Sequence, residues 1–202
     1  NLLVEELEKM NTREIRESVE YIDESSRSAY ELLQNLLEWS RAQIDRVEYS
    51  PVNINLTELV ENNLRIHRNI AGSKQIKLAS QLESVITVHA DENMINTVVR
   101  NLISNALKFT EKGGWVSISA IKYENFVQVA VEDNGLGIEK ENIPRLFSLE
   151  ESYSTKGTGD EHGTGLGLIL CKDFIERNGG EMFVKSEPDR GSIFYFTLPA
   201  GG

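Results

Sequence analysis

Hydrophobic and small residues in the first 50 positions recur with a heptad spacing. Between Arg13 and Arg46 they fall in alternating steps of four and three, while Glu, Asp and Arg occupy most of the remaining positions. The stripe comprises Ile15, Val19, Ile22, Ser26, Ala29, Leu33, Leu36 and Ser40, and it is widened by Leu32 and Leu37. Because such a helix stays soluble only when the stripe is buried against other helices, the pattern predicts a helical hairpin or a dimeric bundle. A solitary amphipathic helix packed on the following domain remains the alternative.

The first residues and Pro51 delimit this helical unit. Apolar residues before position 8 indicate the last turns of a preceding helix, with Asn11 and Thr12 as the turn and cap. The chain opens on Asn1, and we therefore expect it to be a piece of a longer protein. Pro51 is the first proline, and no glycine precedes it. We therefore divide the chain into a helical unit at residues 1–50, a partial helical hairpin, and a second domain at residues 51–202.

The second domain alternates between two hydrophobic periods. Alternating or clustered apolar runs predict strands at residues 52–55, 76–82, 85–89, 115–123, 126–132, 181–186 and 192–198. Helical spacing predicts helices at residues 56–71, from the cap Asp91 to residue 109, and at 140–146 and 165–177. The strands at 76–82 and 85–89 are separated by a polar turn. In the first helix the side chains expected to face a core are Leu56, Leu59, Val60, Leu64 and Ile70.

Composition and charge narrow the class of protein. Hydrophobic residues make up 40% and charged residues 26% of the 202 positions, as in soluble globular proteins. The sequence has no long apolar run and no signal peptide, so we expect a cytoplasmic location for this part, while membrane attachment of the longer protein stays open. The net charge of −11 argues against a nucleic-acid partner. The single cysteine, Cys171, fits a reducing compartment and a buried position on a helix.

Three polar residues share one face of the predicted helix that ends at residue 109. Asn101, Asn105 and Lys108 are spaced by four and three, whereas the apolar residues between them occupy the opposite side. An amide oxygen is a hard ligand that suits magnesium, and an ammonium group balances phosphate charge. A solvated helix face is the structural alternative for this pattern.

Asp133 follows an apolar strand and precedes the turn Asn134-Gly135-Leu136-Gly137. At the end of a strand, its carboxylate projects into a crevice beside backbone that glycine leaves accessible. A carboxylate accepts a hydrogen bond from an exocyclic amine, which is how a site selects adenine over guanine. The structural alternative is a plain Asp-Asn-Gly turn.

A second glycine cluster, GTGLGL at residues 163–168, lies between a polar loop and a predicted helix. The loop at residues 148–162 is nearly without aliphatic side chains, which is typical of a long functional loop. Backbone amides at a helix N-terminus bind anionic phosphates. The cluster is not a Rossmann turn, because no strand precedes it, and no GxxxxGK[ST] phosphate loop occurs in the sequence. With the polar helix face and Asp133, it favours a nucleotide site.

These motifs resemble, in order, four boxes of the sensor histidine kinases of two-component systems. NLISNALKFT (101–110) resembles the asparagine box, DNGLGI (133–138) the first glycine box, RLF (145–147) the phenylalanine box and GTGLGL (163–168) the second glycine box. The heptad helix, which ends ELLQNLLEWSRAQ, resembles the second helix of the dimerisation and phosphotransfer hairpin. The resemblance implies an α+β fold of the Bergerat type, a two-layer α/β sandwich with a mixed sheet under three helices, preceded by a remnant of the hairpin.

The resemblance also implies roles for individual residues. Asn105 would hold magnesium and Asp133 would bind the adenine amine, while Asn101, Lys108 and Arg145 would face the phosphates. The residues that would bind the cofactor by shaping the pocket and the lid hinge are Gly135, Gly137, Gly163, Thr164, Gly165 and Gly167. Phe109 and Phe147 are expected to pack. The implied cofactors are ATP and magnesium.

The identity of residue 101 helps to distinguish phosphate transfer from ATP hydrolysis. In related hydrolases such as gyrase this position is a glutamate that activates water, and an amide cannot act as a general base. The sequence therefore favours transfer of the ATP γ-phosphate to a histidine, for relay to a response-regulator aspartate, over hydrolysis. Two alternatives stay open: a catalytically degenerate, ATP-sensing module that docks a response regulator, and an ATP hydrolase of the gyrase type.

None of the three histidines fits the phosphoacceptor, which in the family lies on the first hairpin helix before an acidic residue and a proline. His67 follows the domain boundary, His89 ends a predicted strand and His162 lies in the polar loop. We therefore expect the chain to bind ATP with magnesium without phosphorylating itself. The expected partners are the receiver domain of a response regulator and a second copy of the chain, bound through the N-terminal helices.

Overall fold

The computed structural model describes residues 11–16, 18–19, 21–22, 26, 49–82, 84–148, 157–158 and 165–202. Its named helices are α3 (Leu56–Ser73), α4 (Glu92–Phe109) and α5 (Gly167–Arg177), together with the 3-10 helix η1 (Ile143–Phe147). Its named strands are β1 (Val52–Asn55), β2 (Lys77–Ser80), β3 (Thr87–Ala90), β4 (Trp115–Lys122), β5 (Phe126–Asp133), β6 (Met182–Glu187) and β7 (Gly191–Pro199).

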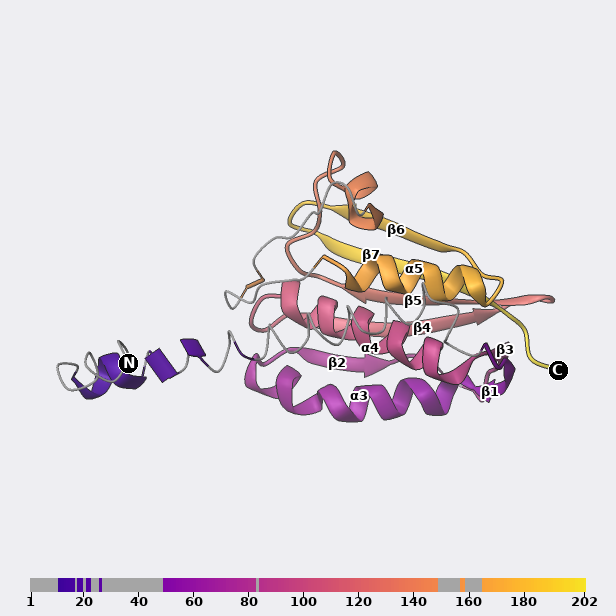
Figure 1. The fold of residues 1–202 in the computed structure, drawn as a ribbon, viewed down its shortest axis with the longest axis horizontal. Helices are drawn as coiled ribbons and strands as arrows, with labels where there is room; N and C mark the ends of the chain where they lie inside the picture. The colour runs from indigo at the N-terminus through magenta and orange to yellow at the C-terminus, as the bar shows by residue number, and fades with distance from the viewer. Residues whose placement is uncertain are drawn as a thin grey trace.

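The strands form two sheets. Five of them pair in the order β2-β4-β5-β7-β6, where β2 runs parallel to β4 and the other neighbours are antiparallel, so this sheet is mixed. The strands β1 and β3 form a separate antiparallel pair. The end of β7 reaches this pair, because Gly201 N donates to Thr87 O at 2.9 Å. The three helices pack against the large sheet and one another, and Figure 1 shows α4 and α5 lying over its strands.

Alternation along the central strands produces this two-layer arrangement. In β5, Val127, Val129 and Val131 are buried, whereas the residues between them are only partly buried. The helix α4 covers this buried side of the sheet. Its apolar stripe, from Met94 to Leu107, is almost inaccessible to solvent. Burial of each such aliphatic side chain stabilises the fold by ~1.5–3 kcal/mol. The predicted sandwich of a mixed sheet and three helices is confirmed.

The buried face of α3 differs from the prediction at one position. Ile70 is 50% exposed, so its assignment to the core was wrong, and Ala71 is buried instead. Two polar residues, Asn63 and His67, take inward positions that the hydrophobic pattern did not indicate. His67 Nδ1 bonds to Asn63 O at 2.8 Å and Asn63 Nδ2 donates to Leu59 O at 2.9 Å, whereas the buried Asn63 Oδ1 has no hydrogen-bond partner among the described residues.

Two further expectations are refined by the structure. The strands at 76–82 and 85–89 were expected to be joined by a turn, but β2 lies at the edge of the large sheet while β3 pairs with β1. The helix expected at residues 140–146 is the shorter 3-10 helix η1, which has Pro144 in its first turn. Proline is tolerated there because a first-turn amide needs no partner within the helix.

The N-terminal helical unit is described only in part. Residues 12–16, 18–19, 21–22 and 26 are helical, and the stripe residues Val19 and Ile22 are 57% and 48% exposed. The rest of the predicted heptad stripe lies outside the described residues. Within the described part of the chain, none of the helices combines the length and the apolar character needed to cross a membrane.

Candidate functional site

The helix α4 carries three of the predicted site residues on a rigid support. Asp91 caps its N-terminus by accepting a hydrogen bond from Met94 N at 3.0 Å, and its apolar face is buried in the core. Asn101, Asn105 and Lys108 are half-buried on the remaining face, as their spacing predicted. The fold of α4 therefore fixes two amides and an ammonium group side by side near the C-terminal end of the helix.

The start of α5 lies against this polar face. A β-carbon placed on Gly167, the first residue of α5, would lie 3.1 Å from Asn101 Oδ1. Asn101 Nδ2 donates to Thr97 O at 3.0 Å, which orients the amide and leaves its oxygen toward Gly167. The asparagine face and part of the second glycine cluster thus meet, although they are far apart in sequence.

Asp133 is the last residue of β5, and its side chain is only 5% exposed. Its Oδ1 accepts a hydrogen bond from Gly135 N at 2.9 Å. Burial raises the pKa of Asp133 from 3.8 to about 6; amide hydrogen bonds from Gly135 and Ser192 oppose the rise, and the nearby Glu132 charge adds to it. Among the described residues, no lysine or arginine pairs with this carboxylate. It is a buried acceptor with capacity left for a donor from outside the chain.

The DNGLGI loop (residues 133–138) is packed against the C-terminal end of α4. Leu136 N donates to Phe109 O at 3.1 Å, and a β-carbon on Gly135 would overlap that same carbonyl. Trp115 N donates to Asn134 Oδ1 at 2.6 Å, which ties the loop to the start of β4. The glycine at position 135 is therefore required by the close approach of two backbones of this chain.

The C-terminus of α4 is also held by hydrogen bonds from Lys74 and Thr158. Lys74 Nζ donates to Leu107 O at 3.1 Å and to Lys108 O at 3.4 Å, where its charge compensates the helix dipole. Thr158 N donates to Lys108 O at 3.1 Å, and Thr158 Oγ1 lies 3.0 Å from both Lys108 O and Thr110 O. A residue of the long polar loop is thereby bound to the helix that carries Lys108.

Of the remaining predicted site residues, the structure describes Arg145 and Gly165 but not residues 163 and 164. Arg145 lies exposed in η1, which packs against α5 through Phe147, whose ring centroid is 5.7 Å from Lys172 Nζ. Gly165 adopts a left-handed conformation with φ of +71°. Gly163 and Thr164 lie outside the described residues, so their predicted contributions to the site stay predictions.

Ser192 lies beside Asp133, and sequence analysis did not identify it. It pairs with Asp133 across β7 and β5, is buried, and has its Oγ 3.0 Å from Ser186 Oγ on β6. A row of three polar side chains therefore crosses three strands at the end of the sheet where the DNGLGI loop begins. The signal in the sequence was a serine in place of an apolar residue at the first inward position of β7, which continues with Phe194.

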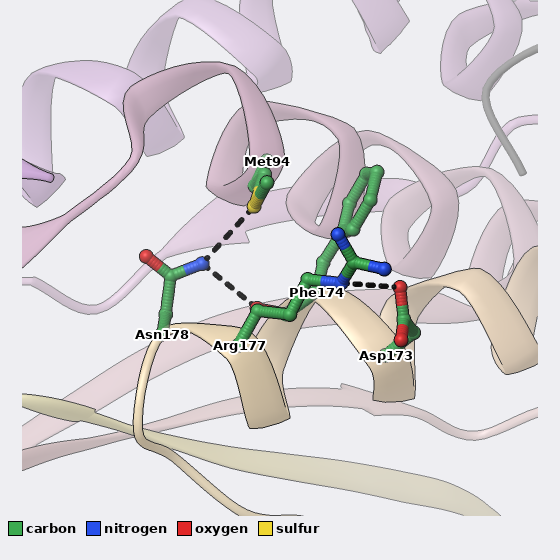
Figure 2. A network of polar contacts seen from close by, with 5 residues as sticks. All are labelled: Met94, Asp173, Phe174, Arg177 and Asn178. Carbon is green, nitrogen blue, oxygen red and sulfur yellow. Dashed lines mark hydrogen bonds and ion pairs between the residues drawn. The ribbon is translucent and has the colours of Figure 1, made fainter. Parts of the chain in front are cut away.

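A polar network anchors the opposite end of α5 to the start of α4. Asn178 caps α5, and its Nδ2 donates to Phe174 O at 2.7 Å and approaches Met94 Sδ at 3.5 Å. Figure 2 shows this amide reaching from the end of α5 toward the first turn of α4. Asp91 N donates to Asn178 Oδ1 at 2.7 Å, so the residue that caps α4 is tied to the residue that caps α5. The relative position of the two site helices is thereby fixed.

The site chemistry fits a purine nucleotide with a hard divalent cation. The buried carboxylate of Asp133 suits an exocyclic amine, and the row that includes Ser192 offers hydroxyl groups beside it. The amide oxygen of Asn105 suits magnesium, while Lys108 supplies positive charge for phosphates. No group of three or more His, Cys, Asp or Glu residues suited to a metal occurs in the part of the chain that the structure describes.

Comparison with known proteins agrees with this chemistry. Residues 90–202 match the family model described as histidine kinase-, DNA gyrase B-, and HSP90-like ATPase. The adaptive-response sensory kinase SasA of Rippkaea orientalis is 35% identical over 170 residues, which cover 83% of this chain and 43% of that protein. The chain thus spans less than half the length of this curated relative.

Solved structures share the fold. The catalytic domain of histidine kinase ThkA has 27% identity and a TM-score of 0.66, over 75% of this chain and 98% of that domain. Full-length ShkA in complex with AMPPNP has 26% identity and a TM-score of 0.75, over 97% of this chain and 41% of that one. ThkA in complex with the response regulator protein TrrA has 20% identity and a TM-score of 0.75, over 95% of this chain and 53% of that one, and shows the fold alone.

Proposed function

Because this chain belongs to the family of histidine kinase-, DNA gyrase B-, and HSP90-like ATPases, we propose that it is the ATP-binding catalytic part of a sensor histidine kinase. The observation that carries the proposal is the buried carboxylate of Asp133, which has no lysine or arginine partner among the described residues, together with the amide and ammonium face of α4. One group suits the adenine amine and the other suits a magnesium triphosphate. Both are fixed by rigid elements, which is what precise positioning of a phosphoryl donor requires.

We assign the roles residue by residue. Asp133 accepts from the adenine amine, Asn105 holds magnesium, and Asn101, Lys108 and Arg145 face the phosphates. Asn101 lies beside Gly167, so its amide is at the N-terminus of α5, where phosphates bind. This position supports the role of Asn101 in facing the phosphates. The pocket and lid residues of the proposal are Gly135, Gly137, Gly163, Thr164, Gly165 and Gly167. When bound, magnesium would neutralise charge on the triphosphate oxygens.

Transfer to a histidine is favoured over hydrolysis. In the transfer, an imidazole nitrogen forms a bond to the γ-phosphorus while the bond from that phosphorus to the β–γ bridging oxygen breaks, so that ADP leaves. Hydrolysis would need a base to activate water, and Asn101, one turn before Asn105, cannot take a proton. The site therefore contributes orientation and charge, and the nucleophile comes from another part of the kinase.

The arrangement of the longer protein follows from this proposal. Residues 1–50 belong to a dimerisation and phosphotransfer hairpin and residues 51–202 to the catalytic domain. A homodimer forms through the helical stripe, of which Val19 and Ile22 are exposed in the single chain. The phosphate then passes to the receiver domain of a response regulator, a partner type that the complex of ThkA with TrrA illustrates. This part of the kinase works in the cytoplasm.

Calorimetry and phosphate transfer together test the proposal. Titration of the chain with ATP and magnesium should show binding that is much tighter than for GTP, and absence of ATP binding would overturn the proposal. A longer form of the protein that includes the upstream helix should then form acid-labile phosphohistidine. ATP binding without phosphohistidine in that form would favour a sensing module. Steady phosphate release by the present chain, abolished in Asn101→Ala, would favour a hydrolase.

A further inference from the structure

The turn between β6 and β7 (residues 187–191) lies directly against the DNGLGI loop. Asp189 N donates to Leu136 O at 2.8 Å. A β-carbon on Gly137 would overlap Glu187 O, so the two backbones touch at a second point. The two segments are separated by about fifty positions in sequence. Contact between them therefore arises only from the sheet topology, which places β7 beside β5.

This turn is one of two supports of the loop. Leu136 uses both of its backbone polar groups, since its N–H donates to Phe109 O at the end of α4 and its carbonyl accepts from Asp189. Gly191, in the same turn as Asp189, approaches the backbone of Asp133 so closely that a β-carbon on Gly191 would overlap Asp133 O. The loop is thus held between the end of α4 and the turn. The position of the Asp133 backbone depends on both contacts.

Asp189 contributes through its backbone and not through its side chain. Its side chain is exposed, and its φ of +59° lies in the left-handed region that residues other than Gly, Asn and Asp rarely adopt. That conformation aims its N–H at Leu136 O. The neighbouring ion pair between Arg190 and Glu187, at 2.7 Å, is exposed and contributes little. The backbone preference at position 189 therefore decides whether the turn keeps the shape that supports the loop.

We propose that Asp189 is a positioning residue for nucleotide binding, which acts through Leu136 to hold the base-binding end of the DNGLGI loop in its competent conformation. This inference rests on the proposed function, because it takes Asp133 to be the base acceptor. A residue that disfavours the left-handed conformation lowers the fraction of molecules with a competent loop. The apparent dissociation constant rises in inverse proportion to that fraction.

A graded series at position 189 tests this role by calorimetric titration with ATP and magnesium at 10 °C. Asp189→Gly and Asp189→Asn retain the left-handed conformation and should bind ATP within about twofold of the unmodified chain. Asp189→Ala should bind about three- to fivefold more weakly, and Asp189→Val about tenfold more weakly. Because the side chain is exposed, none of these changes removes packing. The order of affinities should follow the backbone preference and not the charge.

Gly179→Ala is the matched control. Gly179 has a φ of +74°, and a β-carbon there would meet only Pro199 Cγ at 3.8 Å, an ordinary contact. Thermal melting should show that Gly179→Ala destabilises the fold about as much as Asp189→Ala, while its ATP affinity stays unchanged. Equal affinities across the Asp189 series, or an equal loss in Gly179→Ala, would overturn the inference. Absence of ATP binding in the unmodified chain would instead overturn the proposed function on which the inference rests.

Discussion

Replacement of Asp133 by Asn is expected to stabilise the fold at neutral pH while weakening ATP binding. The pKa of Asp133 is raised from 3.8 to about 6, mainly by burial, and each pKa unit corresponds to ~1.4 kcal/mol. Because the folded-state pKa is the higher one, the stability that this group contributes is full below pH 3.8 and is lost as the pH rises through 6. Ionised Asp133 thus costs the fold up to ~3 kcal/mol, and the neutral amide avoids this cost.

Urea unfolding of both proteins between pH 4 and pH 8 measures this effect. We expect Asp133→Asn to match the unmodified chain near pH 4 and to gain ~1–3 kcal/mol by pH 7.5. The control is Glu124→Gln, which removes an exposed carboxylate in the turn between β4 and β5 and should change the stability by less than ~0.5 kcal/mol throughout. Stability curves of Asp133→Asn and the unmodified chain that run parallel across this range would refute the reasoning.

The same carboxylate should make recognition of the base depend on pH. Below pH 6 the protonated group is a weaker acceptor for an exocyclic amine, so the preference for ADP over GDP should fall between pH 7 and pH 5.5. Comparing the two diphosphates cancels titration of the phosphates, which they share. A preference that stays constant over this interval would show that Asp133 does not read the base.

Three further predictions concern α4 and α5. Asn105→Ala should lose most of the enhancement of ATP binding by magnesium, whereas Asn93→Ala, which changes an exposed amide on the same helix, should retain it; calorimetry with and without magnesium measures both. Asn178→Ala should lower the free energy of unfolding by ~2–3 kcal/mol, measured in urea, because it leaves the buried Asp91 N–H without its acceptor. Thr158→Val should weaken protection of the loop against proteolysis near position 158, since the hydroxyl contacts to the end of α4 are lost; an unchanged cleavage rate would argue against that attachment.

Local patterns were sufficient for most elements of the catalytic domain. The alternation in β5 and the apolar stripe of α4 identified their buried faces, because side chains on one face of a strand or helix recur with a fixed period. The helix cap at Asp91 was likewise predicted. The pattern failed in α3, where Asn63 and His67 face inward and Ile70 faces solvent. Inward polar residues become tolerable only through hydrogen bonds, and these are not visible in a hydrophobic pattern.

The sequence by itself determined which residues are candidates for the site. Asn105, Lys108 and Asp133 could be singled out because the motifs that contain them occur together in a recognisable order, although each motif alone has an ordinary structural alternative. The roles assigned to these residues remain proposals that the experiments above test. Segment 163–164, which was expected to complete the pocket, lies outside the described residues.

Only the tertiary structure decided how the site is held together. Pairing of β5 with β7 places Ser192 beside Asp133 and brings the turn that contains Asp189 against Leu136. Ser192 and Asp189 are both far in sequence from the residues that they contact, and neither belongs to a periodic hydrophobic pattern. Sequence periodicity reports which face of an element is buried, whereas contacts between elements depend on strand order and register. Asp133 could therefore be singled out from the sequence, but the contacts that support it could be found only in the fold.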